Sequence, residues 1–412
     1  MIENLYILSL PFTSAFALKS FLPLPLLISF ILTFKFIFIK NIKFKISIVD
    51  IILFIFLFMI SISYICNLFI LRYSPKLLNH FSSYFITLLF YYFIIKNILY
   101  IYVLKKGINK VLKFVLLSVL LASIFGTINF LGKNFFGFDL DNYIYRPMVE
   151  NMNALAIGFY RSRSFIEEPG HFAMFLEIFF PLSLYYLLNI KVNKNYIILY
   201  SFIVIISFLF TFSTAGIMIS IISIFSVFIY YLFQNKSVLK NIYLYKQLFY
   251  ILIFLLVILS IFNYYGLFDL FQLIEYINSK LNGSNSSNDR LDRVHEALSL
   301  FSNSGLFHIL FGFGPGGYLL YIKSIISLYL LLLLETGIIG LFLFILFQFL
   351  VLKHILSLNS NIKYYFLFSF ISATFHYSLI SNYWYPWYWF LIVLIEIQYY
   401  LELKRKKNVY NI

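Results

Sequence analysis

Charged residues are scarce in this sequence: Asp, Glu, Lys and Arg make up only 11% of its 412 residues, against roughly 25% in soluble domains. This deficit excludes an ordinary soluble enzyme and also a disordered chain. A single cysteine, Cys66, excludes a fold built on disulfides, and 16 glycines exclude a collagen-like chain. The residues present are 62% hydrophobic, so the class that remains is a polytopic membrane protein.

Twelve windows are apolar enough to be membrane-spanning helices, which need about 20 residues each. We therefore predict an all-α fold with one polytopic membrane domain over residues 1–412. The first window resembles a signal peptide, but it lacks a basic leading segment and another span follows directly, so we expect it to be retained. The windows are 3–18, 21–39, 46–66, 81–102, 111–131, 170–190, 196–212, 214–233, 247–266, 324–350, 364–381 and 386–402.

The cations divide unevenly between the alternate loops that these spans create. One side collects nineteen Lys and one Arg, and the other collects five Lys and six Arg. Because cytoplasmic loops are enriched in Lys and Arg, the richer side is predicted to be cytoplasmic, with both termini on it. The net charge of +15 then reflects topology and does not indicate a nucleic-acid partner.

Arginine is the more informative cation, because the chain holds seven Arg against 24 Lys and six of the seven fall on the external side. The planar guanidinium suits bidentate binding of phosphate or carboxylate. Two external segments, 132–169 and 267–323, are long enough to form structures of their own. We therefore expect an anion-binding site on the external face, with chance clustering as the alternative.

The densest group of reactive side chains is the run RSRSFIEEPGH at 161–171, which opens the sixth span. In a structural interpretation, the two Glu cap a helix that begins at the proline and pair with the Arg. In a functional interpretation, Arg161 and Arg163 bind a phosphate while Glu168 or His171 acts as general base, with Glu167 in support. Five such residues within eleven at a membrane surface favour the functional interpretation.

A second group combines two Arg with a glycine-rich run. Arg290 and Arg293 precede Gly312, Gly314 and Gly316, whose backbone N–H groups can approach an anion closely. The run is neither a nucleotide-binding P-loop, because no Lys-Ser/Thr follows, nor a dinucleotide fingerprint, because no strand–helix unit surrounds it. Anion binding and a plain tight turn are equally favoured.

Polar residues within the predicted spans raise a further question, because an acid in hydrocarbon usually faces a cavity or a partner. Glu335 is the clearest case, whereas Gly337 beside it favours close helix packing. We interpret His376 as a satisfied polar contact. No zinc-type spacing of Cys and His exists, so we predict no metal and no cofactor. The aromatic run at 382–389 is typical of a membrane-interface belt.

Together these features resemble the O-antigen polymerase/ligase superfamily, and within it the Wzy-type polymerases of O-antigen or capsule. The resemblance is carried by twelve spans and two large external loops. It is also carried by Arg-x-x-x-x-Glu-Pro from Arg163 to Pro169, by Arg before Gly-x-Gly-x-Gly, and by Glu-x-Gly-x-x-Gly from Glu335 to Gly340.

The resemblance implies a glycosyltransferase that polymerises oligosaccharide repeat units carried on undecaprenyl pyrophosphate, at the outer face of the bacterial inner membrane. Arg163, Arg290 and Arg293 would then stabilise the pyrophosphate leaving group, with Arg161 supporting. Glu168 or His171 would deprotonate the acceptor hydroxyl. Besides the lipid-linked substrate and membrane lipid, the expected partners are a chain-length regulator and a flippase of the same pathway.

Two other functions remain open. A ligase usually carries a His-Asn pair about nine residues before the acid of the Glu-x-Gly motif, but here that register holds Ile326 and Ser327. A flippase or other transporter usually places charge along many spans and keeps its loops short, whereas here the loops hold most of the charge. A polymerase is therefore favoured over both.

Overall fold

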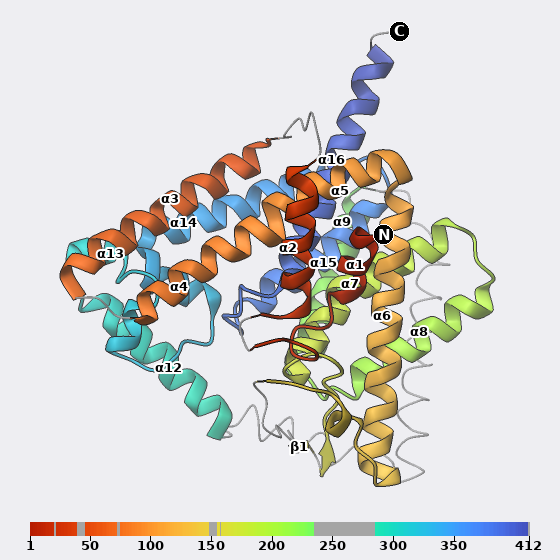
Figure 1. Ribbon diagram of the computed structural model, residues 1–412, viewed down its shortest axis with the longest axis horizontal. Coiled ribbons are helices and arrows are strands. Elements are labelled where there is room, and N and C mark those ends of the chain that lie inside the picture. Colours follow the sequence, from red (N-terminus) through yellow and green to blue (C-terminus); the bar gives the residue numbers. More distant parts are fainter. Residues whose placement is uncertain are drawn as a thin grey trace.

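The computed structural model describes residues 1–19, 22–38, 46–71, 75–147, 155–156, 158–234 and 285–410. These residues form a bundle of helices with one short antiparallel hairpin (Figure 1). By length and composition, six helices of this described part could cross a membrane, which fits the predicted all-α membrane protein. The six are Ile48–Phe69, Lys76–Lys106, Ile108–Phe136, Pro169–Asn189, Thr214–Gln234 and Leu328–Leu356.

Most of the predicted windows fall on helices, but the window 3–18 forms only an eight-residue helix followed by turns, too short to span a bilayer. The window 247–266 lies outside the described residues. In chain order the α-helices are α1 (Ile2–Ser9), α2 (Leu24–Ile37), α3 (Ile48–Leu71), α4 (Pro75–Ile86), α5 (Ile94–Lys106), α6 (Ile108–Leu131), α7 (Pro169–Asn189), α8 (Lys194–Leu209), α9 (Thr214–Gln234), α12 (Asn285–Ser302), α13 (Leu306–Phe311), α14 (Leu328–Leu356), α15 (Ile362–His376) and α16 (Pro386–Tyr410).

Shorter elements join these helices, one within the predicted span 81–102 and the others in the two large predicted external loops. The π-helical η1 (Thr87–Phe93) links α4 to α5, and the π-helical η2 (Gly132–Phe136) extends α6. The 3-10 turn η3 (Leu140–Tyr143) and the hairpin of β1 (Leu155–Ala156) and β2 (Phe159–Tyr160) belong to the first loop, and the 3-10 turn η5 (Gly317–Leu320) belongs to the second.

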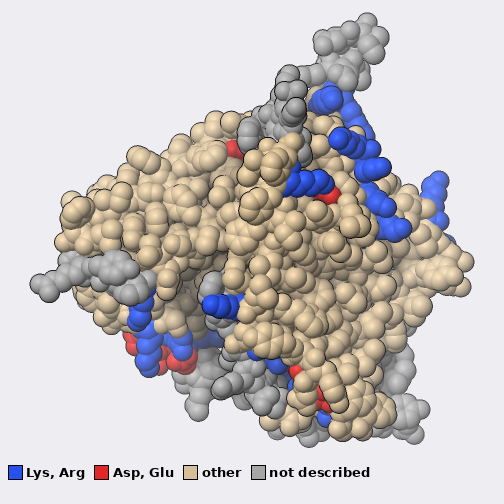
Figure 2. All heavy atoms as spheres, in the orientation of Figure 1, with Lys and Arg blue, Asp and Glu red and all other residues tan. Residues whose placement is uncertain are grey.

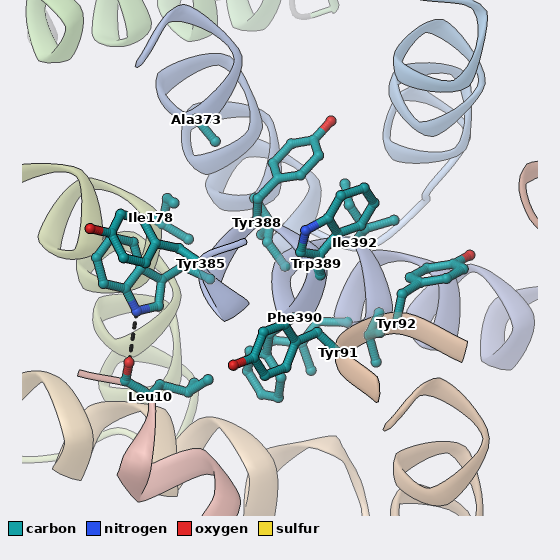
Figure 3. Packing of buried hydrophobic residues seen from close by; sticks show 14 of the residues in the cluster. Leu10, Tyr91, Tyr92, Ile178, Ala373, Tyr385, Tyr388, Trp389, Phe390 and Ile392 are labelled. Carbon is teal, nitrogen blue, oxygen red and sulfur yellow. Dashed lines mark hydrogen bonds between the residues drawn. The ribbon is translucent and has the colours of Figure 1, made fainter. Parts of the chain in front are cut away.

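The last helix, α16, occupies the centre of the bundle. Over residues 387–397 no side chain is more than 3% exposed, as expected for a helix that is apolar on every side. It packs against η1, α5, α7, α14 and α15, and Figure 3 shows its rings with side chains of η1, α7 and α15.

The interpretation of the aromatic run as an interface belt is wrong for its two buried tryptophans. The indole N–H of Trp387 donates to the Leu10 carbonyl at 2.7 Å (dashed in Figure 3), and that of Trp389 donates to the Tyr383 carbonyl at 2.7 Å. Because both N–H groups are satisfied within the core, these rings need no polar interface. Trp384 differs, because it is 40% exposed.

Replacing Trp387 by Phe is expected to lower the free energy of unfolding by about 1–3 kcal/mol. The buried Leu10 carbonyl loses its donor, and the smaller ring leaves a cavity. Thermal unfolding of the detergent-solubilised protein, followed by circular dichroism, measures this loss. Trp384→Phe is the matched control, with an expected change within about 0.5 kcal/mol; equal losses in the two variants would contradict the assigned packing.

Charge and apolar surface are separated on the outside of the molecule. In the face shown in Figure 2, Lys and Arg lie mostly towards two opposite edges, and uncharged residues cover the wide area between. Exposed large apolar side chains include Phe54, Phe58 and Phe69 on α3 and Phe342 and Phe349 on α14. Such a band suits contact with lipid.

Candidate functional site

Asp141, in the first loop, is the centre of a cluster of buried charges. Its carboxylate lies 2.8 Å from Arg146 Nη2, 3.1 Å from Arg163 Nε and 3.4 Å from Lys133 Nζ. Burial acts to raise the pKa of Asp141, but Arg146, Arg163 and Lys133 outweigh burial and hold this pKa below its ordinary value. The carboxylate therefore stays ionised and joins η2, η3 and the segment before α7.

Arg146 connects this cluster to the rest of the molecule. Its Nη1 donates to the Ile166 carbonyl at 2.8 Å and to Ser14 Oγ at 3.2 Å, and its Nη2 also donates to the Ser164 carbonyl. Only 3% of its side chain is exposed. Arg146 thus fixes the backbone immediately before Glu167.

The two arginines predicted to bind phosphate take part in local packing. Arg163 is engaged with Asp141, and its Nη1 is buried without a hydrogen-bond partner. The Nε of Arg161 donates to the Thr211 carbonyl at 2.8 Å, at the corner between α8 and α9. Both guanidinium groups therefore help to hold the loop against neighbouring helices.

A pocket of about 630 Å³ opens beside this loop, within the size range of small-molecule sites. Glu167 is the only acid among its described lining residues, and these include no Lys, Arg or His. Along α4 and η1 the lining residues recur at helical spacing, so one face of this segment forms a wall. The lining consists of Thr13, Ser14, Ala17, Pro23, Leu26, Asn79, Ser82, Ser83, Ile86, Thr87, Tyr91, Pro147, Glu167, Trp384, Tyr385 and Pro386.

Tyr385 holds Glu167 in place at this pocket. Its hydroxyl donates to Glu167 Oε2 at 2.7 Å and lies 3.1 Å from Nδ1 of His171. Because a hydroxyl carries one proton, Nδ1 of His171 must be the donor in the second hydrogen bond. Burial, followed by the facing Glu167 carboxylate, raises the pKa of Tyr385 well above its ordinary value, so the phenol remains a donor.

Neither predicted general base lines the pocket. Glu168 is exposed, and its side chain makes no capping hydrogen bond at the start of α7. His171 is 5% exposed, and its Nδ1 lies 3.1 Å from the Tyr385 hydroxyl. Glu167, predicted to have only a supporting role, is the carboxylate that reaches the pocket.

The glycine-rich run packs against a break in α14. Gly337 has a φ of +67° inside this helix, and the Gly314 N–H donates to the Glu335 carbonyl at 3.1 Å. A Cβ on Gly312 would lie 2.4 Å from the Glu335 carbonyl carbon, and one on Gly316 would lie 2.8 Å from the Lys76 carbonyl oxygen. These glycines therefore permit close backbone packing, the turn-like alternative for this motif.

The Glu335 carboxylate is fully engaged at this break. It lies 2.8 Å from His80 Nδ1 and accepts hydrogen bonds from the Tyr84 hydroxyl at 2.5 Å and from the Gly316 N–H at 2.7 Å. The Gly316 N–H, which the anion-binding interpretation left available to a ligand, thus donates to a carboxyl group of the protein itself.

Arg290 and Arg293 lie on α12, away from the first loop. Arg293 pairs with Asp289 at 2.9 Å and donates to Ser324, while Arg290 is exposed. In Figure 1, α12 and the hairpin β1–β2 lie on different sides of the lower part of the molecule. Within the described residues, the structure brings Arg163 together with Arg146 and does not join it to either arginine of α12.

Two further groups of polar side chains lie inside the bundle. His376 on α15 contacts Glu177 on α7, whose other oxygen accepts from Ser220 at 2.6 Å. A larger network joins α3, η1, α5, α14 and α16. It consists of Asp50, Tyr92, Lys96, His354 and Glu396, with His354 Nδ1 2.6 Å from Glu396 Oε1.

Sequence reasoning singled out neither Tyr385 nor the pairing of Asp141 with Arg146 and Arg163. The sequence signal for the latter was an acidic pair, Asp139 and Asp141, that lies between Lys133, six residues before Asp139, and Arg146, five residues after Asp141. Among the described residues, no three His, Cys, Asp or Glu side chains gather as a metal site would require. Comparisons with protein families, curated proteins and solved structures found no match.

Proposed function

We propose that the protein is a membrane glycosyltransferase that polymerises lipid-pyrophosphate-linked oligosaccharide repeat units into O-antigen or capsular polysaccharide, at the outer face of a bacterial inner membrane. The observation that supports this function best is the pocket, whose single carboxylate, Glu167, is oriented by Tyr385. Group transfer to a hydroxyl needs a positioned base in a site of this size.

In the proposed reaction, Glu167 removes the proton of an acceptor hydroxyl. The hydroxyl oxygen bonds to the anomeric carbon of the donor, and the bond from that carbon to the pyrophosphate oxygen breaks, with its electron pair leaving on the pyrophosphate. Oε2 of Glu167 already accepts from Tyr385, so Oε1 is the oxygen available to the substrate.

The surroundings of the loop suit an anionic leaving group. Lys133, Arg146 and Arg163 outnumber Asp139 and Asp141 by one charge, and Ser14 joins this cluster to the pocket wall. A fixed positive surplus stabilises negative charge that develops in the transition state. Arg290, exposed on α12, remains a proposed contact for the pyrophosphate.

The test is the surface polysaccharide of a deletion strain. Loss of a polymerase leaves single repeat units attached to the lipid core, and the wild-type gene restores long chains. Glu167→Gln is expected to restore at least about a hundredfold less polymer, the scale of a lost general base. Glu168→Gln, one residue away and exposed, is expected to restore normal polymer.

Immunoblots of membranes must show equal amounts of both variants. Normal polymer from Glu167→Gln would contradict the assignment of the base. Full-length polymer that is not attached to the lipid core would instead indicate a ligase, and absence of repeat units from the outer face would indicate a flippase.

A second candidate, a proton-coupled transporter of the same lipid-linked units, is favoured by one observation. Three carboxylate–histidine contacts lie within helices of the bundle, formed by Glu335 with His80, Glu396 with His354 and Glu177 with His376. Such pairs are typical of proton pathways in membranes. Under this alternative, Glu396→Gln would stop delivery of repeat units to the outer face, whereas a polymerase would still display single units.

A further inference from the structure

From the side chains that line the pocket we infer its ligand class: it receives the acceptor sugar and selects an uncharged sugar over one that carries a carboxylate. This inference rests on the proposed function, because it assigns one of the two substrates of that reaction to the pocket.

The polar part of the lining suits hydroxyl groups. Six Ser, Thr and Asn side chains come from the segment after α1 and from the α4–η1 wall, namely Thr13, Ser14, Asn79, Ser82, Ser83 and Thr87. Each can both donate and accept a hydrogen bond, as a sugar hydroxyl can. A pyrophosphate would require cations, and none is present among the described lining residues.

The aromatic part of the lining suits the apolar face of a sugar ring. Trp384 is 40% exposed, in contrast to the buried Trp387 and Trp389, and it lines the pocket beside Tyr385. A partly exposed indole offers a broad flat surface at low conformational cost. An uncharged sugar ring has an apolar face and hydroxyl groups around its edge, so it matches both the aromatic and the polar part of this lining.

The single charge of the lining disfavours acidic sugars. A uronate carboxylate in this pocket would face Glu167, and repulsion between like charges is strong where water is partly excluded. Arg146 does not pair with such a carboxylate inside the pocket, because its guanidinium is bound to Asp141 and to the Ser164 and Ile166 carbonyls.

The chain supplies its own reporter for a binding experiment. It has three tryptophans, and only Trp384 is exposed. The full-length protein in lipid nanodiscs free of glycolipid is titrated with two neutral trisaccharides, N,N′,N″-triacetylchitotriose and maltotriose. It is also titrated with trigalacturonic acid, which is negatively charged. We expect saturable fluorescence changes with a neutral trisaccharide and at least about tenfold weaker binding of the acidic one. Trp384→Phe is expected to abolish the signal.

Glu167→Gln distinguishes charge selection from a merely structural role. We expect this variant to bind trigalacturonic acid about tenfold more tightly than the wild type does, with neutral binding changed less than twofold. Glu168→Gln is expected to leave both affinities at the wild-type values. A structural loss would weaken all three saccharides together.

Equal or tighter binding of trigalacturonic acid by the wild type would overturn the inference, as would failure of both neutral trisaccharides to bind. If Glu167→Gln still bound neutral trisaccharides more tightly than trigalacturonic acid by the wild-type ratio, the Glu167 charge would not be the cause of the selectivity. These outcomes are distinguishable from failure of the proposed function, because normal polymer in the deletion strain would refute polymerisation while selective sugar binding persisted.

Discussion

Replacing Asp141 by Asn is expected to lower the free energy of unfolding by about 3–5 kcal/mol, the usual cost of removing one partner from a buried ion pair. The substitution keeps the shape of the side chain but leaves Arg146 and Arg163 without their shared counter-charge. Only 7% or less of each of these three side chains is exposed, so water cannot solvate the two guanidinium groups. Chemical unfolding in detergent, followed by circular dichroism, measures the change.

Asp139→Asn is the matched control for Asp141→Asn. Asp139 is two residues away and pairs with Lys133 at 2.9 Å, but 24% of its side chain is exposed, so we expect a loss of only about 1 kcal/mol. Adding Arg163→Met to Asp141→Asn is expected to recover part of the stability, because one stranded charge is removed. Equal losses in the two Asn variants would contradict the central role of Asp141.

The same carboxylate predicts a pH dependence. The pKa of Asp141 in the folded protein is lower than its ordinary value, which is about 3.9 in an unfolded chain. Its stabilising contribution is therefore complete above about pH 4 to 5 and is lost as the pH falls through the lower, folded-state pKa. The free energy of unfolding of the wild type should fall to that of Asp141→Asn only in this acidic range. If the two free energies became equal near pH 7, the direction given for the pKa shift of Asp141 would be wrong.

Replacing Gly337 by Ala is expected to destabilise the protein by about 3–5 kcal/mol. Its φ of +67° is one that residues with a side chain rarely adopt, and an added Cβ would lie 2.3 Å from the Leu310 carbonyl oxygen. The cost combines backbone strain with overpacking against α13. Helix content and unfolding in detergent, compared with the wild type, measure the effect.

Gly107→Ala separates these two costs. Gly107 has a φ of +77°, but nothing lies within 4 Å of the position where its Cβ would be, so only backbone strain of about 1–3 kcal/mol is expected. The difference between the two variants then measures the cost of placing a Cβ in the contact between Gly337 and α13. If the two variants lost equal stability, that contact would contribute nothing.

Apolar length predicted most of the helices, because a span must be long and apolar wherever it lies in the bundle. It could not predict the position of a helix within the bundle. The aromatic run before and within α16 has the composition of an interface belt, yet Trp387 and Trp389 are buried because other helices surround α16. Only the tertiary packing distinguishes these two locations.

The candidate site was predicted in its region and not in its individual roles. The run at 161–171 does border the pocket, but Glu167 and Glu168 are adjacent residues outside any regular element, so no periodicity shows which one faces inward. Glu167 is held at the pocket by a hydrogen bond from Tyr385, which lies 218 positions away in the chain. Likewise, the sequence of the glycine-rich run did not predict that the Gly316 N–H would donate to Glu335, because that contact depends on the break in α14.

The central position of α16 has a consequence for biosynthesis. Among the described helices α16 comes last in the chain, so the earlier helices can enter the membrane in order but cannot complete their packing until α16 has been synthesised. A chain that stops before Pro386 would lack the helix against which α5, α7, α14 and α15 pack. The apolar faces of these helices would then be exposed to quality-control proteases. Insertion of this protein and its assembly are therefore separate events.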